Sequence, residues 1–129
     1  MDSKKEIKAW REIKISKRFL NAFRGMHVFI MTTRHLFLLM FAIAAVIILG
    51  FSLKVSNFEW IALVFSIGFV IVSEIFNTAI EIDIDLTSPQ YHPFARDTKD
   101  VAAAAVLLSI ITSIIVGCIV FLPKIFLII

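Results

Sequence analysis

Three long apolar stretches, separated by short polar segments, dominate the pattern of hydrophobic and polar positions in this chain. Residues 36–53 and 101–122 carry no charged side chain, and residues 60–80 are interrupted only by Glu74, Asn77 and a few small polar groups. A helix that crosses a bilayer needs about 17–25 mainly apolar residues. The pattern therefore predicts three membrane-spanning helices, at about residues 30–53, 60–85 and 99–122.

The first 24 residues show a different pattern, in which apolar side chains recur among lysines and arginines. Such a segment is typical of an amphipathic helix that lies in the membrane interface. Gly25 marks the expected boundary between this surface helix and the helix that enters the membrane. We therefore expect an all-α membrane protein in which a single domain, residues 1–129, contains an interfacial helix at residues 1–24 and three spans.

Composition and charge agree with a membrane protein and indicate its orientation. The chain is 60% hydrophobic, with a mean hydropathy of +0.94 and a net charge of +3. Most lysines and arginines precede the first span, and cytoplasmic segments carry an excess of these residues. We expect a multi-pass protein of the plasma (inner) membrane, with the N-terminus and the 82–100 loop in the cytoplasm and the C-terminus outside. Basic residues beside a span usually orient it and contact lipid headgroups, so nucleic-acid binding is not expected.

Four polar residues follow one another at helical spacing along the second span and beyond it. Glu74, Asn77, Glu81 and Asp85 fall on one face of a helix, over a length of about 16 Å. A carboxylate inside a membrane span is unfavourable by a few kcal/mol, so it usually marks a functional site. We call these four residues the polar stripe.

The polar stripe has the chemistry of phosphoryl transfer. Carboxylate and amide oxygens suit Mg²⁺, a nearby lysine such as Lys99 suits phosphate, and a glutamate at the inner leaflet suits a general base. Lys99 and Asp100 lie at the same depth, where the third span begins. The four glycines are too far apart for a Gly-rich nucleotide loop, so a nucleotide would be held in another way.

Two other interpretations of the polar stripe remain open. One is a purely structural role, and the other is a proton or ion pathway. A pathway would need polar groups deeper in the spans, where the sequence has only scattered serines. His27 and His35 are predicted to fill interfacial positions rather than to bind a ligand.

Several motifs resemble those of the prokaryotic diacylglycerol kinase family, small three-span membrane enzymes. The resemblance covers roughly residues 15–124. Its motifs are EIFNTAIE at residues 74–81, Asp85, KDVAA at residues 99–103, YHP at residues 91–93, the entry residues Arg18, Phe19, Ala22 and Gly25, and FLPK at residues 121–124. The last of these resembles the Gram-positive branch, whose members act as undecaprenol kinases.

This resemblance implies a homotrimer with active sites between subunits, in which Mg·ATP donates its γ-phosphate to a lipid hydroxyl. Glu74 would be the catalytic general base, and Glu81 would bind Mg²⁺ together with Asn77. The residues implied in nucleotide binding are Asn77, Asp85, Tyr91, His92, Lys99 and Asp100.

One departure from the family pattern concerns the metal site. The family usually has a second metal-binding glutamate eight residues after the entry glycine, and Thr33 occupies that position here. Our first hypothesis is a lipid kinase with ATP and a membrane lipid alcohol as substrates, undecaprenol being slightly favoured over diacylglycerol. The alternative is a non-catalytic trimeric relative that has lost turnover through Thr33.

Overall fold

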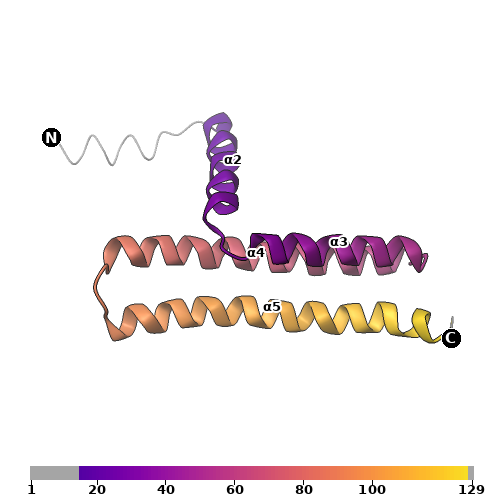
Figure 1. Ribbon diagram of the computed structural model, residues 1–129. Coiled ribbons are helices and arrows are strands. Elements are labelled where there is room, and N and C mark those ends of the chain that lie inside the picture. Colours follow the sequence, from indigo (N-terminus) through magenta and orange to yellow (C-terminus); the bar gives the residue numbers. More distant parts are fainter. Residues whose placement is uncertain (1–14, 128–129) are drawn as a thin grey trace. The chain divides into compact units, whose positions relative to one another are not determined.

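The computed structural model describes residues 15–127, the side chain of residue 16 excepted, and these residues form helices joined by short connections (Figure 1). The helices group into two compact units, α2 in the first and α3 to α5 from Arg34 onward in the second. The single domain expected for residues 1–129 therefore stays a prediction. The helices are α2 (Ile15–Thr32), α3 (Leu36–Ser52), α4 (Asn57–Thr87) and α5 (Pro93–Phe126).

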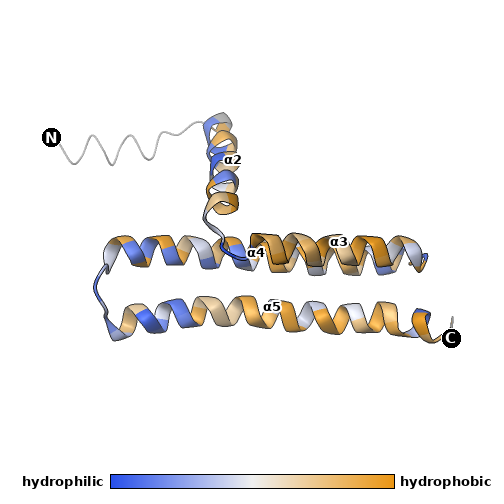
Figure 2. Ribbon diagram, in the orientation of Figure 1, coloured by the Kyte–Doolittle hydropathy of each residue, from blue (hydrophilic) through white to orange (hydrophobic). Residues whose placement is uncertain are grey.

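Two of these helices are long and apolar enough to cross a membrane, which agrees with an all-α membrane protein. α4 has 31 residues and α5 has 34, and each contains an apolar stretch long enough to span a bilayer. α3 has 17 residues, at the lower limit for a span. Polar residues gather at the end of α4 and the start of α5, whereas α3 is apolar along nearly its whole length (Figure 2).

The helix boundaries differ from the predicted ones at two places. α2 continues through Gly25, around which a side chain would meet no atom within 4 Å, and ends at Thr32. A glycine inside a helix is unfavourable by only about 1 kcal/mol, so neighbouring residues keep the helix intact. The expected break at Gly25 is therefore wrong, and residues 30–32 belong to α2. The predicted surface helix falls mainly on residues 1–14, which lie outside the described residues.

The second difference is the start of α5, which lies at Pro93 rather than near residue 99. Proline suits the first turn of a helix because it lacks an N–H that would need a partner there. Nδ1 of His92 accepts a hydrogen bond from the backbone N–H of Phe94 at 3.3 Å and caps the same turn. The helix therefore begins before the predicted span, and Lys99 lies in its second turn.

A seam of serines holds α4 against α5, which run antiparallel side by side (Figure 1). The hydroxyls of Ser73 and Ser109 lie 2.7 Å apart, and Ser113 donates to the backbone carbonyl of Ser66 at 3.1 Å. Ser109 is completely buried. Small side chains allow close helix packing in lipid. The hydroxyls of Ser73, Ser109 and Ser113 also donate to carbonyls of their own helices, whereas the buried hydroxyl of Ser66 has no partner among the described residues.

The connection between α3 and α4 closes the end of the unit that is far from the polar stripe. Ser56 and Glu59 form a reciprocal capping box at the start of α4, and Nζ of Lys124 on α5 lies 3.0 Å from Oε2 of Glu59. A methyl group at Gly50 of α3 would lie only 2.5 Å from the indole of Trp60, so the helix pair requires glycine there. A buried apolar cluster fills the space behind this contact, formed by Val55, Leu63, Val120 and Phe121.

We predict that Gly50→Ala destabilises the second unit, because the added methyl group would force the Trp60 ring away from α3. Overpacking of this kind typically destabilises by about 1–3 kcal/mol. Unfolding in mixed micelles, followed by circular dichroism, would measure it. Gly68→Ala is the matched control, since a side chain there meets no atom within 4 Å. Equal stability of the two variants would contradict the prediction.

Candidate active site

The four residues of the polar stripe lie on α4, where the helix continues past its apolar part. Nδ2 of Asn77 donates a hydrogen bond to Oε1 of Glu81 at 3.2 Å, so these two side chains share one face of the helix. Glu74 and Asn77 are half-buried, whereas Glu81 and Asp85 are exposed. The stripe therefore runs from a partly covered carboxylate into solvent.

Asn77 and Glu81 offer oxygen atoms that suit a magnesium ion. Oδ1 of Asn77 is buried and has no hydrogen-bond partner among the described residues, while Nδ2 of the same amide holds the Glu81 carboxylate beside it. Mg²⁺ is often bound through one or two protein oxygens together with water and substrate phosphates. No group of three His, Cys, Asp or Glu side chains that could hold a metal occurs in the described part of the chain. The two residues could contribute oxygen ligands to a magnesium site that other ligands would have to complete.

A cavity of about 280 Å³ lies where the loop between α4 and α5 folds back. Lys99 on α5 forms an ion pair with Asp85 on α4 across this cavity. The structure thus brings together five of the residues predicted to bind a nucleotide. The cavity is lined by Asp85, Tyr91, His92, Lys99 and Asp100, among others.

Arg96 is a member of this loop cavity that the sequence analysis did not single out. Its Nη1 lies 3.5 Å from the hydroxyl of Tyr91, and its Nε lies 3.9 Å from a carboxylate oxygen of Asp100. Its Nη2 is 3.0 Å from a carboxylate oxygen of Asp97. The sequence signal for Arg96 was its spacing of four residues from Asp100, which places both side chains on one face of a helix. This signal was missed because the helix was predicted to begin only near residue 99.

A second cavity, of about 520 Å³, lies between α3, α4 and α5 and is open on one side. We call it the membrane groove. Its walls are almost entirely apolar, and Glu74 and His35 lie together at one end of it. The prediction that His35 merely fills the interface missed this shared location, because it depends on how α3 packs against α4.

Thr33 follows the last residue of α2 and takes part in ending that helix. Its hydroxyl donates to the backbone carbonyl of Phe29 at 2.7 Å, and its backbone N–H bonds to the same carbonyl at 3.0 Å. The position expected to carry a metal-binding carboxylate therefore holds a side chain that bonds to its own helix.

The chain matches known proteins over most of its length. The sequence model described as prokaryotic diacylglycerol kinase matches residues 20–121. An undecaprenol kinase of Bacillus subtilis (strain 168) is 39% identical over 108 residues, which cover 84% of this chain and 88% of that protein. A diacylglycerol kinase of Escherichia coli (strain K12) is 33% identical over 78 residues, which cover 60% of this chain and 64% of that protein. A diacylglycerol kinase of Synechocystis sp. is 49% identical over 55 residues, covering 42% and 31% respectively.

If the loop cavity binds the phosphates of a nucleotide, Arg96→Ala should weaken the binding of a non-hydrolysable ATP analogue by about tenfold, because a guanidinium–phosphate hydrogen bond contributes more than a neutral one. Titration calorimetry in micelles would measure the dissociation constant. Arg96→Lys keeps the charge and should lose less affinity. An unchanged dissociation constant in Arg96→Ala would show that the loop cavity does not hold the phosphates near Arg96.

Proposed function

We propose that this chain, which belongs to the prokaryotic diacylglycerol kinase family, transfers the γ-phosphate of Mg·ATP to the hydroxyl group of a membrane lipid. One observation carries the proposal: Glu74 lies at the end of an apolar groove. Asn77, Glu81 and Asp85 lead from Glu74 along the same helix to a polar cavity in the loop. A lipid-soluble acceptor and a water-soluble donor can therefore approach the same stripe from opposite ends.

Glu74 is the proposed general base. Its carboxylate would accept the proton of the lipid hydroxyl, whose oxygen forms a bond to the γ-phosphorus while the bond to the β,γ-bridging oxygen breaks and ADP leaves. Phosphoryl transfer of this kind depends mostly on positioning and on neutralising phosphate charge. Glu74 is half-buried, a position that would restrict water around the reacting hydroxyl.

Nucleotide and metal would occupy the remainder of the stripe. Asn77 and Glu81 are proposed to hold Mg²⁺, which when bound neutralises charge on the phosphates. Lys99 and Asp100 would position the phosphates and ribose, with Asp85 beside them. Tyr91 and His92 are exposed at the loop cavity, where they would contact the adenine.

Undecaprenol is the acceptor that the groove favours. Apart from its hydroxyl, a polyprenol carries no polar group, and the groove walls offer few polar side chains beside Glu74 and His35. Diacylglycerol would bring ester groups into the same space, where unpaired polar atoms are unfavourable. The similarity to an undecaprenol kinase over most of its length supports the same choice, and diacylglycerol is the next candidate.

The proposal includes three spans and a homotrimer in the plasma membrane. α3 would be the first span, and the basic residues before it would keep the N-terminus and the loop cavity in the cytoplasm, with the C-terminus outside. A trimer would bring residues of a second copy to the stripe, where they could complete the metal site proposed at Asn77 and Glu81.

Thr33 favours a second candidate function, a trimeric membrane protein that binds nucleotide without turnover. Its hydroxyl bonds to the carbonyl of Phe29, and a hydroxyl carries no charge with which to hold a metal. The presence of Glu74, Asn77 and Glu81 in one stripe supports the kinase more strongly, because a protein without turnover would not need a base beside the groove.

The kinase is tested by transfer of labelled phosphate from ATP to undecaprenol or diacylglycerol, each offered separately in mixed micelles. We expect Mg²⁺-dependent transfer, greater with undecaprenol. Glu74→Gln should lower turnover by about 10²-fold or more while leaving ATP binding within a few fold, because only proton acceptance is lost. Near-normal turnover of Glu74→Gln would refute the assignment of the base. No transfer to either lipid by the folded wild-type protein would favour the non-catalytic relative.

Thr33→Glu tests the altered metal site. An added carboxylate should lower the Mg²⁺ concentration needed for half-maximal activity and raise turnover, if position 33 faces the metal in the assembled protein. Thr33→Gln is the matched control, since it has a similar size without the charge. The same Mg²⁺ dependence in both variants would show that position 33 lies away from the metal.

A further inference from the structure

The membrane groove has a closed end, opposite Glu74. Leu63 on α4 and Phe121 on α5 line the groove and belong to the buried cluster behind the Gly50–Trp60 contact. They are 2% and 8% exposed. Leu49 on α3 also lines the groove, next to Gly50, but it is 42% exposed, so Leu63 and Phe121 are the packed residues at this end. An apolar chain that enters beside Glu74 therefore meets a packed floor.

The depth of the groove follows from helix geometry on two of its walls. Glu74 and Leu63 are eleven residues apart on α4, and Ile110 and Phe121, which line the groove on α5, are also eleven residues apart. At 1.5 Å per residue, both distances along the helix axes are about 16 Å. The two walls agree, so the groove would accept roughly this length of an extended chain.

We propose that the floor formed by Leu63 and Phe121 limits how much of the lipid acceptor the groove holds, so that only the first 16 Å or so of its hydrocarbon chain are bound there. This inference rests on the proposed kinase function and adds to it a set of specificity residues. A polyprenol longer than the groove would keep the rest of its chain in the surrounding lipid. The occupant is a lipid chain rather than a helix of another copy, because the groove is continuous with the carboxylate that would take the hydroxyl proton.

The physical basis of this selection is fit rather than hydrophobicity. Lipid tails are as apolar as the groove walls, so an acceptor chain gains no hydrophobic free energy when it leaves the lipid for the groove. What it gains is van der Waals contact, which falls off steeply when atoms are displaced. A side chain that fills part of the groove should therefore exclude the acceptor sterically, without changing the polarity of the wall.

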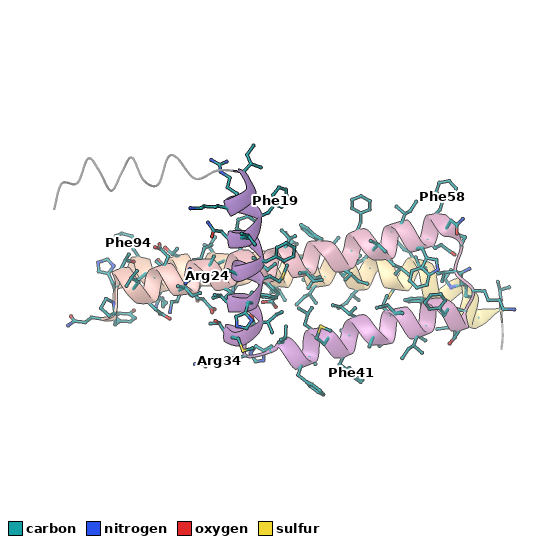
Figure 3. The ribbon with its side chains drawn as sticks, turned by 90° about the horizontal axis from the view of Figure 1, so that it is seen from above. Phe19, Arg24, Arg34, Phe41, Phe58 and Phe94 are labelled. Carbon is teal, nitrogen blue, oxygen red and sulfur yellow. The ribbon has the colours of Figure 1, made fainter. Side chains whose placement is uncertain are left out.

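Neighbouring alanines of α3 provide matched variants at different places. Ala42 and Ala45 line the groove, nearer its mouth and nearer its floor respectively, whereas Ala44 does not line it. Phe41 shows the outward direction on this helix: it is 65% exposed and points away from α4 and α5 (Figure 3). Replacing each alanine with phenylalanine makes the same chemical change, inside the groove at Ala42 and Ala45 and outside it at Ala44.

The experiment measures the acceptor KM, as mole fraction in the micelle, for a series of prenols from geraniol to undecaprenol. In the wild-type protein, KM should fall as the chain lengthens and level off once the chain reaches the floor. Ala45→Phe should move this plateau to a shorter chain and raise the undecaprenol KM about fivefold or more, with geraniol little affected. Ala42→Phe should raise KM for every acceptor, and Ala44→Phe should leave the series unchanged.

Several outcomes would overturn the inference and can be told apart from failure of the kinase proposal. If the wild-type protein phosphorylates prenols but Ala45→Phe and Ala44→Phe give the same length dependence, the floor does not limit the length of chain that the groove binds. If Ala45→Phe changes the oligomeric state and not KM, a second copy occupies the groove. Failure of the wild-type protein to phosphorylate any prenol or diacylglycerol would instead refute the kinase function itself.

Photo-crosslinking gives a second readout that does not depend on turnover. A farnesol derivative with a diazirine at the end far from the hydroxyl should label the peptide that contains Leu63 or Phe121. Labelling confined to outward-facing positions such as Phe41 would place the chain outside the groove and overturn the proposal.

Discussion

The α4 helix must remain hydrogen-bonded along its whole length within the bilayer, because lipid offers no partner to a free backbone group. The same helix continues without interruption to Thr87, beyond its apolar part. A continuous helix fixes the rise and the direction of every side chain on it. The spacing of Glu74, Asn77, Glu81 and Asp85 therefore does not depend on a loop, and the chemistry proposed for them uses a rigid frame.

The pairing of α4 with α5 determines what the stripe can meet. The serine seam holds the two helices together in the membrane, and the short loop at residues 88–92 turns the chain back on itself. Lys99 is thereby brought opposite Asp85, although fourteen residues separate them in the sequence. α3 meets α4 closely at the other end, where Gly50 contacts Trp60 and the rings of Phe51 and Trp60 lie 5.1 Å apart. Tight contact at that end leaves the groove beside Glu74.

The sequence predicted the features that depend on local periodicity and missed those that depend on packing. The stripe could be found because helical spacing places its four residues on one face. That Lys99 lies near the stripe could be predicted because a short loop joins two antiparallel helices. The continuation of α2 through Gly25 could not be predicted, since one glycine only weakens a helix. The start of α5 at Pro93 was missed because the capping residue and the proline that begin this helix were both assigned to the preceding loop. The groove and the place of His35 within it arise from three helices meeting, which no single segment encodes.

Thr33 changes how phosphate charge could be neutralised in this chain. A carboxylate at that position would add a charged metal ligand, whereas the threonine hydroxyl bonds to the carbonyl of Phe29. A magnesium ion held by fewer protein oxygens keeps more water and depends more on phosphate oxygens for its binding. The metal would then bind together with the nucleotide, as a complex, rather than bind to the protein beforehand. Under that arrangement the cationic side chains of the loop cavity, Arg96 and Lys99, would take a larger share in holding the phosphates.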